Sequence, residues 1–267
     1  GRLPAGVRRI HADRSDQAQV VAGLKGRQFD VAFDISGHKP SELQPVVDTL
    51  EGNVGSYVFC STVGYYDPGD VAPIREDSPL VSGPRPDKIL CEDLLLEMFH
   101  QSGFPATIIR PPYIYGPHDH IPRRLFSIFA RLSRGREIIV PGEGLMLTHT
   151  VHVDDVASAF AAVPEKDQGL GQIYNVAGPE SITFRGYANT IASVMRVDAL
   201  LTYVDIRDYT ALCEELGPRS REVFDYNWQE SLIYSTEKIR QQLGWSPRYD
   251  IYEGVEMTYR WWLEQGL

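Results

Sequence analysis

Histidines and acidic residues form the first two groups in this sequence that could do chemistry. His118 and His120 make an H-x-H pair, a spacing used by metal sites, but no third ligand follows at a suitable distance. We therefore interpret this pair as part of a polar loop that holds no metal. His152 precedes Asp154 and Asp155, yet no nucleophile elbow completes a hydrolytic triad. This second group is more typical of a strand end followed by a helix with acidic residues in its first turn.

Hydroxyl groups and one lysine form a third group. Thr62 closes the apolar run SYVFCST, Tyr65 and Tyr66 follow it, and Lys88 lies in PDKILCEDLLLE. By default such a threonine is a core hydroxyl, such tyrosines are packing aromatics, and a helix-borne lysine is a solvated charge.

A basic cluster is the last group, and by default it is a solvated helix face. It is also a local patch that could meet a phosphate. Its members are Arg123, Arg124, Arg131, Arg134 and Arg136.

Strand-like and helix-like segments alternate around these residues. Nearly continuous apolar runs at 29–36, 56–62 and 105–111 are typical of strands covered on both faces. Helical spacing of apolar residues separates them at 41–50 and 87–102. The alternation predicts an α/β fold with a doubly wound parallel sheet. We expect further strands at 7–11, 137–142, 172–178 and 200–206, and further helices at 13–24, 123–135, 151–163, 183–195, 236–243 and 251–262.

Composition excludes several classes of protein. The 267 residues include 26 Lys and Arg against 36 Asp and Glu, a net charge of −10 that disfavours nucleic acid. No apolar run reaches the roughly 18 residues of a membrane span. The 3 cysteines cannot all pair and form no C-x-x-C, which favours a reduced, cytoplasmic compartment.

Six segments, taken in order, resemble one family. They are YVFCSTVGYY, PDKILCEDLLLE, RPPYIYGP, VHVDDVASAF, YNVAG and LGWSPRYDIYEGV. Their order and spacing resemble the extended short-chain dehydrogenase/reductases, the NAD-dependent epimerase/dehydratase family. The segments DISGHKPSELQPVVDTL, RPPYIYGP and ITFRGYANTIASV further resemble the subfamily of chloroplast stem-loop-binding proteins and their bacterial relatives, some of which are associated with RNA.

The resemblance implies hydride transfer with NAD or NADP. Thr62 matches a Ser or Thr that polarises the substrate oxygen, and Lys88 matches a Lys that binds the nicotinamide ribose. Pro84 stands where the family has its proton-donating Tyr, and proline has no proton to give. We assign Tyr66 as the substitute, with Tyr65 and, through the fold, Tyr113 as alternatives.

The resemblance also assigns cofactor contacts. Asp13 matches an Asp that accepts a bond from the adenine amino group, although it could instead cap the next helix. Ser36 and Gly37 match a turn that lines the cofactor, as does the backbone around Pro111 and Tyr113. The family's glycine-rich phosphate turn, G-x-x-G-x-x-G, is absent from the sequence.

A substrate-binding position also departs from the family. Thr148 stands where nucleotide-sugar epimerases have an Arg that binds diphosphate, and a neutral hydroxyl cannot replace a guanidinium. We therefore expect a sugar or sugar-derived small molecule as substrate without assigning its nucleotide.

The resemblance predicts two regions in a Rossmann-like fold. Residues 1–117 and about 145–180 would form the dinucleotide-binding domain, and about 118–144 and 181–267 the substrate-binding region. The first strand, helix and strand of the family, about 35–45 residues, would precede Gly1. A homodimer through the helices at 41–50 and 87–102 is implied by resemblance only.

Two functional hypotheses follow. The first is an NAD(P)-binding epimerase, dehydratase or reductase with an altered active site. The alternative is a non-catalytic RNA-binding or protein-binding member on the same scaffold. We expect a cytoplasmic protein, or a protein of the plastid stroma if the source is a plant.

Overall fold

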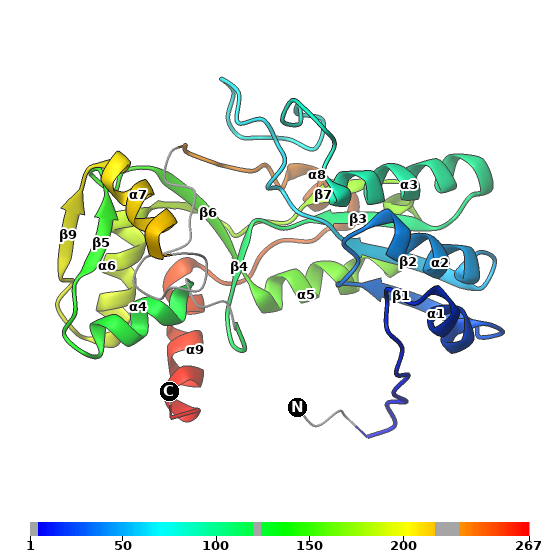
Figure 1. Cartoon of the computed structure of the whole chain (residues 1–267), viewed down its shortest axis with the longest axis horizontal. Coiled ribbons are helices and arrows are strands. Elements are labelled where there is room, and N and C mark those ends of the chain that lie inside the picture. Colours follow the sequence, from blue (N-terminus) through cyan, green and yellow to red (C-terminus); the bar gives the residue numbers. More distant parts are fainter. Residues whose placement is uncertain (1–4, 120–123, 217–229, 267) are drawn as a thin grey trace. The chain divides into compact units, whose positions relative to one another are not determined.

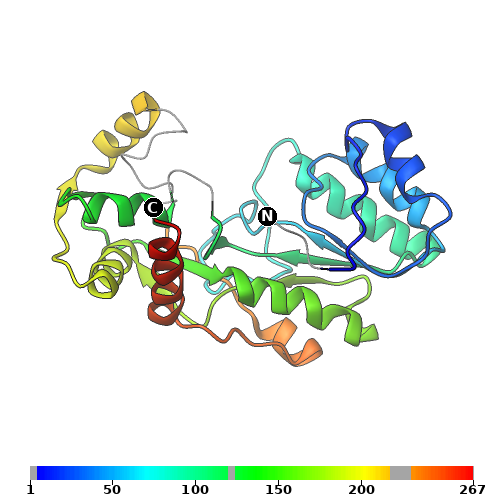
Figure 2. The same ribbon diagram turned by 90° about the horizontal axis from the view of Figure 1, so that it is seen from below.

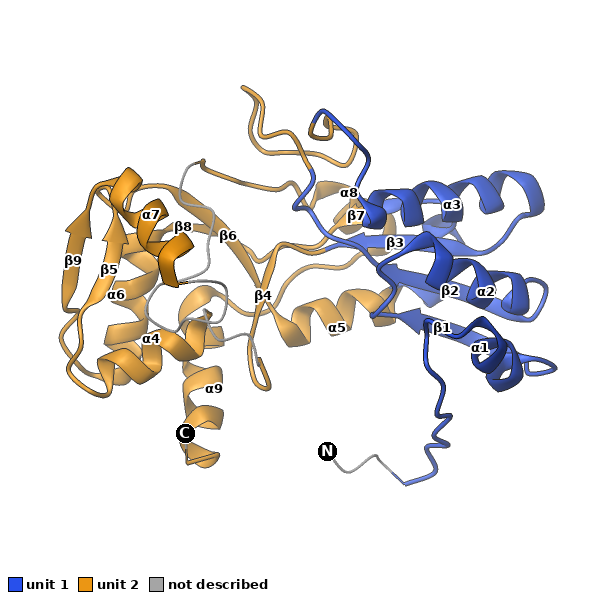
Figure 3. Ribbon diagram, viewed as in Figure 1, with its two compact units in different colours: residues 1–65, 82–110, 163–173 blue, residues 66–81, 111–162, 174–267 orange. Residues whose placement is uncertain are grey.

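A computed structural model describes residues 5–119, 124–216 and 230–266, and its elements are labelled in Figure 1. The chain divides into two compact units. Unit 1 comprises 1–65, 82–110 and 163–173, and unit 2 comprises 66–81, 111–162 and 174–267 (Figure 3). Of the stretch 145–180, which we assigned to the dinucleotide-binding domain, only 163–173 belongs to unit 1. The assignment of functions to domains stays a prediction.

A parallel sheet forms the centre of unit 1. Strands β1 (Phe29–Asp34), β2 (Val54–Cys60) and β3 (Ala106–Arg110) pair in parallel, with Val31 opposite Ser56 and Phe59 opposite Ile108. The strand order is β1-β2-β3-β7, and the chain passes into unit 2 within β7 (Ile173–Asn175). The predicted α/β fold with a parallel sheet is confirmed.

Three helices belong to unit 1: α1 (Gln17–Leu24), α2 (Pro40–Leu50) and α3 (Asp87–Ser102). Leu43 and Val47 of α2 are fully buried against a cluster that includes Tyr57, Phe59 and Leu95. Burying each such side chain contributes about 1.5–3 kcal/mol. Two short 3₁₀ turns, η1 (Val163–Glu165) and η2 (Asp167–Gly169), complete the unit.

Helix α3 begins and ends at the predicted residues. Pro86 occupies the N-cap, where its missing N–H costs nothing, and Gly103 ends the helix with φ of 74°. Pro84 lies before the helix and is exposed. Position 84 therefore does not stand on the face of α3 that carries Lys88.

The segment before α1 differs from the prediction. Residues 7–11 form no strand, and Val7 and Ile10 are exposed. An extended segment becomes a strand only when a neighbour accepts its hydrogen bonds, and 7–11 pairs with no described strand. Helix α1 starts at Gln17 rather than Asp13 because Asp16 is the N-cap, accepting from the Gln19 N–H at 3.1 Å.

Unit 2 contains two small sheets. Strands β4 (Tyr113–Tyr115), β6 (Leu147–His152) and β8 (Ser181–Thr183) form one, in the order β4-β6-β8. Strands β5 (Ile138–Pro141) and β9 (Leu201–Val204) form the other. The strands β4 and β8 were not predicted, and of β6 only its end at His152 was; β6 moves the start of the next helix from 151 to 153.

Helices enclose the core of unit 2. In Figure 2, α4 (Leu125–Leu132), α6 (Phe184–Met195) and α9 (Ile251–Glu264) lie beside one another. Their residues Phe129, Ile191 and Val255 belong to one buried cluster. The remaining helices are α5 (Val153–Ala162), α7 (Ile206–Leu216), which was not predicted, and α8 (Glu237–Leu243). Thr183 caps α6 as predicted, accepting from the Gly186 N–H at 3.0 Å. Across the described ranges, no helix has the length and apolarity of a bilayer span.

Candidate functional site

Lys88 is the most constrained of the predicted site residues. It lies in the first turn of α3, is buried, and donates from Nζ to the Cys60 carbonyl oxygen at 2.5 Å. The ammonium also lies 4.7 Å from the centre of the Phe59 ring. Burial lowers the pKa of Lys88. An ammonium has three N–H groups, so two remain after the Cys60 bond.

A buried ion pair fixes the same helix one turn further on. Glu92 accepts from Arg110 at the end of β3, with Nε to Oε1 at 2.9 Å and a second bond from Nη2 to Oε2. The two side chains are 2% and 4% exposed. Because Lys88 and Glu92 are four residues apart, they lie on one helix face. The ion pair thus sets the position of α3, and with it Lys88, against the sheet.

Thr62 follows β2 directly and is half-buried. Its Oγ1 accepts from the Gly64 N–H at 3.1 Å, which leaves the hydroxyl proton available as a donor. The residue that accepts from Lys88, Cys60, stands two positions earlier. Both predicted groups, Thr62 and Lys88, are therefore placed at the carboxyl end of β2.

Tyr66 belongs to unit 2, and its hydroxyl proton is donated to another side chain of the protein. Its OH donates to Asn175 Oδ1 at 2.8 Å, and its ring lies 6.2 Å from that of Tyr234. A phenol that gives its proton to an amide is a poor proton donor to substrate, so this geometry opposes the catalytic assignment of Tyr66. That assignment stays a prediction.

Asp13 is exposed, and Ser15 occupies its carboxylate. The Ser15 hydroxyl donates to Oδ1 at 2.7 Å and the Ser15 N–H does so at 2.9 Å, and these bonds lower the pKa of Asp13. The structure places its neighbour Arg14, and not Asp13, against the end of β1. The adenine contact of Asp13 stays a prediction.

Arg14 and Asp34 form a polar cluster that sequence reasoning missed. The guanidinium donates to both carboxylate oxygens, Tyr57 donates to Asp34 Oδ2 at 2.5 Å, and the Gly37 N–H donates to Oδ1 at 2.9 Å. Burial raises the pKa of Asp34, but the bonds from Arg14 and Tyr57 outweigh it and leave that pKa below its usual range. A carboxylate closing an apolar strand was the available signal, since burial without a partner is costly.

A cavity of about 570 Å³ lies beside β1 within unit 1, a volume typical of small-molecule sites. Its lining is mostly apolar, from α1, β1 and α2, with Arg14, Asp34 and Ser36 as polar groups. Gly37 stands beside Ser36, and a Cβ there would lie 2.9 Å from Arg14 Nη2 and from the Phe59 ring. Of the two predicted residues, Ser36 lines this cavity, and Gly37 follows it in the turn packed against Arg14 and Phe59.

Pro111 and Tyr113 belong to unit 2, at the start of β4. Pro111 is buried, and the Arg124 guanidinium lies 4.6 Å from the centre of the Tyr113 ring. Burial raises the pKa of Tyr113. Their contact with a cofactor stays a prediction.

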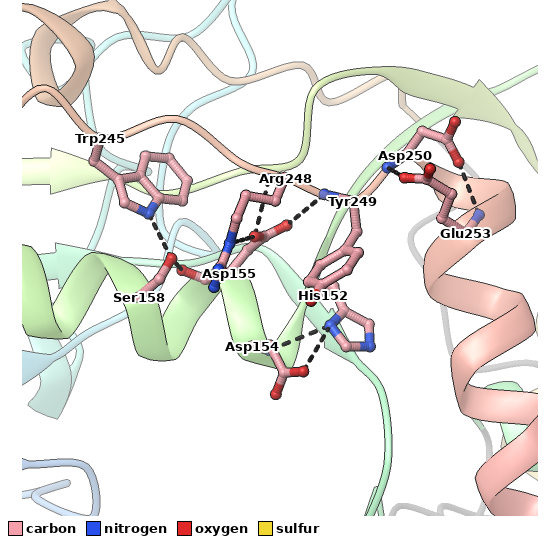
Figure 4. A network of polar contacts seen from close by, with 9 residues as sticks. All are labelled: His152, Asp154, Asp155, Ser158, Trp245, Arg248, Tyr249, Asp250 and Glu253. Carbon is pink, nitrogen blue, oxygen red and sulfur yellow. Dashed lines mark hydrogen bonds and ion pairs between the residues drawn. The ribbon is translucent and has the colours of Figure 1, made fainter.

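Figure 4 shows the polar contacts of the acidic group near His152, which join α5 to the segment that precedes α9. Asp155 is fully buried and accepts from the backbone N–H groups of Arg248 at 3.0 Å and Tyr249 at 3.2 Å. Close by, Trp245 donates to Ser158 Oγ at 2.8 Å. The interpretation of this group as a strand end followed by the first turn of a helix is confirmed, because β6 ends at His152 and α5 begins at Val153.

The remaining sequence groups carry no site in the described part of the chain. Arg131 of α4 donates to the carbonyl of Glu137, beyond the end of the helix, at 2.8 Å, and Arg134 donates to the Ala130 carbonyl at 3.3 Å. Arg123 and His120 lie outside the described residues. Within 5–119, 124–216 and 230–266, no three His, Cys, Asp or Glu side chains form a metal-binding group.

Known proteins resemble this chain along most of its length. The model of the NAD dependent epimerase/dehydratase family matches residues 44–177. Chloroplast stem-loop binding protein of 41 kDa b from Arabidopsis thaliana is 31% identical over 251 residues, which are 94% of this chain and 63% of that protein. Probable GDP-L-fucose synthase 1 from Oryza sativa subsp. japonica is 27% identical over 230 residues, 80% of this chain and 64% of that protein. The chain thus spans less than two thirds of the length of these relatives.

Solved structures share the fold. DesIV, a dTDP-glucose 4,6-dehydratase from Streptomyces venezuelae crystallised with NAD, has a TM-score of 0.73 and 21% identity, covering 95% of this chain and 79% of DesIV. The UDP-glucose 4-epimerase of Thermotoga maritima has a TM-score of 0.74 and 19% identity, covering 96% and 84%. Because the family model matches half of the chain, the chain belongs to the NAD-dependent epimerase/dehydratase family.

Proposed function

We propose that this protein binds NAD or NADP and acts on a sugar or sugar-derived substrate through an altered form of the family's active site. The observation that carries the proposal is Lys88, held at the Cys60 carbonyl beside Thr62 at the carboxyl end of β2. Doubly wound sheets bind their ligands at this edge. The sugar-nucleotide dehydratases and synthases among the relatives support the substrate class.

The described residues fit two parts of such a dinucleotide. The two remaining N–H groups of Lys88 suit the hydroxyls of the nicotinamide ribose. The cavity beside β1, with Ser36 in its lining, suits the adenosine end. No glycine-rich turn follows a strand among the described residues, so the fit does not extend to the pyrophosphate.

The cofactor, when bound, supplies a nicotinamide ring that accepts or returns a hydride. Thr62 would donate its free hydroxyl proton to the substrate oxygen, and Lys88 would hold the ribose in place. The proton-transfer role lacks its usual group, because Pro84 is exposed and lies outside α3. Loss of a general acid or base lowers rates by roughly 10²–10⁴-fold, so we infer slow turnover.

Calorimetry with NAD and with NADP tests cofactor binding by the wild-type protein. We expect saturable binding of at least one of them. The absence of a heat of binding at cofactor concentrations up to millimolar would contradict the proposal.

A second function, RNA binding, is favoured by one relative in particular. The 31% identical relative from Arabidopsis thaliana is named a stem-loop binding protein of the chloroplast. The net charge of −10 opposes this function. Filter binding of a stem-loop RNA across salt concentrations tests it: a steep fall of affinity with salt supports RNA binding, and no retention at low salt excludes it.

A further inference from the structure

The Asp34 carboxylate lies on the same face of the unit 1 sheet as Phe59. The two residues are register partners in the parallel pair of β1 and β2, so their side chains point to the same side. The Asp34 side chain is 5% exposed, and its oxygens accept from Arg14, from Tyr57 and from the Gly37 N–H. A buried carboxylate with several such donors stays ionised.

The turn after β1 joins this carboxylate to Lys88. A Cβ at Gly37 would lie 2.9 Å from the Phe59 ring and 3.0 Å from Asp34 Oδ2, so only a glycine lets these side chains pack so closely. On its other side, the centre of the Phe59 ring lies 4.7 Å from Lys88 Nζ. Continuous contacts therefore lead from the Asp34 carboxylate, through this turn and the Phe59 ring, to the Lys88 ammonium.

Lys88 is a buried cation that these charges influence. Burial lowers the pKa of Lys88, the charge of Asp34 raises it, and the charge of Arg14 lowers it. The thiols of Cys60 and Cys91 also act on Lys88, but burial raises the pKa of each thiol, so both are neutral near pH 7. Among these groups, Asp34 is the one that carries a negative charge near neutral pH.

Stability alone does not call for a charged group at this place. Exchanging a buried ion pair for apolar side chains of similar volume is often neutral or stabilising. Ala32, two residues earlier on the same face of β1, packs against an apolar cluster, and an apolar residue at position 34 would continue that contact. Glu92, a second carboxylate near Lys88, is already bound by Arg110. The charge of Asp34 is thus better explained by its effect on Lys88.

We propose that Asp34 is a positioning residue of the cofactor site, which fixes the Phe59 ring against Lys88 and supplies the counter-charge of that lysine. The proposal rests on the proposed function, in which the Lys88 ammonium binds the nicotinamide ribose. Asp34 acts through Lys88 and needs no contact with the cofactor. Arg14 orients the carboxylate by donating to both of its oxygens.

The first test measures the charge of Lys88 without any cofactor. NMR of protein with isotope-labelled lysine follows the titration of Lys88, whose signal is identified by its loss in Lys88→Arg. We expect Asp34→Asn to lower the pKa of Lys88, because a negative charge is lost and the Arg14 charge is left uncompensated. Arg14→Gln should raise that pKa, because the carboxylate then acts alone. Unchanged titration, or shifts of the same sign in both variants, would overturn the proposal.

Two controls separate the charge from the fold. Tyr57→Phe removes one hydrogen bond from Asp34 but keeps the carboxylate, so a fall of the Lys88 pKa as large as in Asp34→Asn would mean a merely structural role. Asp30→Asn removes an exposed carboxylate from the same strand and should change nothing. Should Asp34→Asn fail to fold, Arg14→Gln, at a side chain that is 27% exposed, decides alone: no rise of the Lys88 pKa overturns the proposal.

The second test relates this charge to cofactor binding. Calorimetry with NAD and NADP at several pH values compares the wild type with Asp34→Asn. We expect the ratio of the two Kd values to grow with pH toward about tenfold, the loss that follows removal of a charged donor. A ratio that does not change with pH contradicts the role of Asp34. Absence of binding by the wild type contradicts the proposed function instead, and the titration of Lys88 still decides whether Asp34 supports that lysine.

Discussion

Lys88 donates a hydrogen bond from Nζ to the carbonyl oxygen of Cys60 at 2.5 Å, and the Phe59 ring lies against the same ammonium. Both partners are the last residues of β2, so the strand end itself holds the lysine. The tyrosine that the family places one helical turn before this lysine is not needed for that position. A cofactor contact made by Lys88 can therefore survive the change to Pro84.

Removal of the Lys88 ammonium should weaken cofactor binding. We expect Lys88→Ala to raise the Kd for NAD or NADP by about tenfold or more, because hydrogen bonds from a charged donor contribute roughly 1.5–3 kcal/mol. Lys25→Ala, at an exposed lysine of the same unit, is the control and should leave the Kd unchanged. Equal affinities of the wild type and Lys88→Ala, measured by calorimetry, would remove Lys88 from the cofactor site.

The buried pair of Glu92 and Arg110 should matter for stability. Glu92→Ala leaves the Arg110 guanidinium buried without its carboxylate, and we expect the free energy of unfolding to fall by about 3–5 kcal/mol. Replacing both residues with Met should recover most of this loss, since an apolar pair of similar volume needs no charge compensation. Urea denaturation of the three proteins measures both effects.

An exposed pair on α9 provides the contrast. Arg260 and Glu256, four residues apart, form an ion pair at 2.8 Å with both side chains exposed. Glu256→Ala should cost no more than about 0.5 kcal/mol. Similar losses for Glu92→Ala and Glu256→Ala would mean that the buried pair does not fix α3.

Asp155 should be required for the fold of unit 2. Asp155→Ala removes the acceptor of two backbone N–H groups, of Arg248 and Tyr249, and we expect a loss of about 3 kcal/mol in the free energy of unfolding. Asp154→Asn is the control, because that neighbouring side chain is 52% exposed. Thermal unfolding that ranks the two variants the other way round would contradict the network in Figure 4.

Acid should destabilise the protein through His149. Its Nε2 donates to the Gly178 carbonyl at 2.9 Å and its Nδ1 accepts from the Tyr234 N–H at 3.1 Å, an arrangement that only the neutral ring allows. Burial lowers the pKa of His149, partly offset by the bond to Gly178, and burial also lowers the pKa of His152. The unfolded chain, with a histidine pKa of about 6.5, then binds more protons than the folded one just below that pH.

The contribution of His149 is therefore complete above about pH 7 and declines as the pH falls below about 6.5 toward the folded pKa. We expect urea midpoints of the wild type to decrease from pH 7.5 to pH 5.5. His149→Gln should be less stable at pH 7.5 and show a smaller decrease. Parallel decreases in the two proteins would rule out His149 as the group that titrates.

The spacing of apolar residues and the capping residues in the sequence were sufficient to predict part of the fold. The apolar periodicity of 87–102, between Pro86 and Gly103, gave both ends of α3, and the acidic residues after His152 marked the start of α5. Only the end of β6, at His152, was predicted, because its residues LTHTVH place polar side chains on both faces and periodicity detects only apolar faces. Residues 7–11 show the opposite error: a strand was predicted there, but the segment pairs with no described strand.

Contacts between site residues that are far apart in the sequence could not be predicted from the sequence. Thr62 and Lys88 could be assigned by family resemblance, but the bond of Lys88 to a backbone carbonyl carries no residue-type signal. Arg14 and Asp34 are 20 positions apart, and only the fold brings them together. The Tyr66 bond to Asn175, which spans 109 positions, is another such contact and is the one that most opposes a predicted role.

The proposed function requires that this chain binds NAD or NADP through Lys88, although Pro84 stands at the position of the family's tyrosine. Isothermal titration of NAD and NADP into the wild type, beside Lys88→Ala and Lys25→Ala, tests it most directly. We expect saturable binding to the wild type and to Lys25→Ala, with affinity at least tenfold weaker in Lys88→Ala. No heat of binding at millimolar cofactor, or equal affinity in all three proteins, would contradict it.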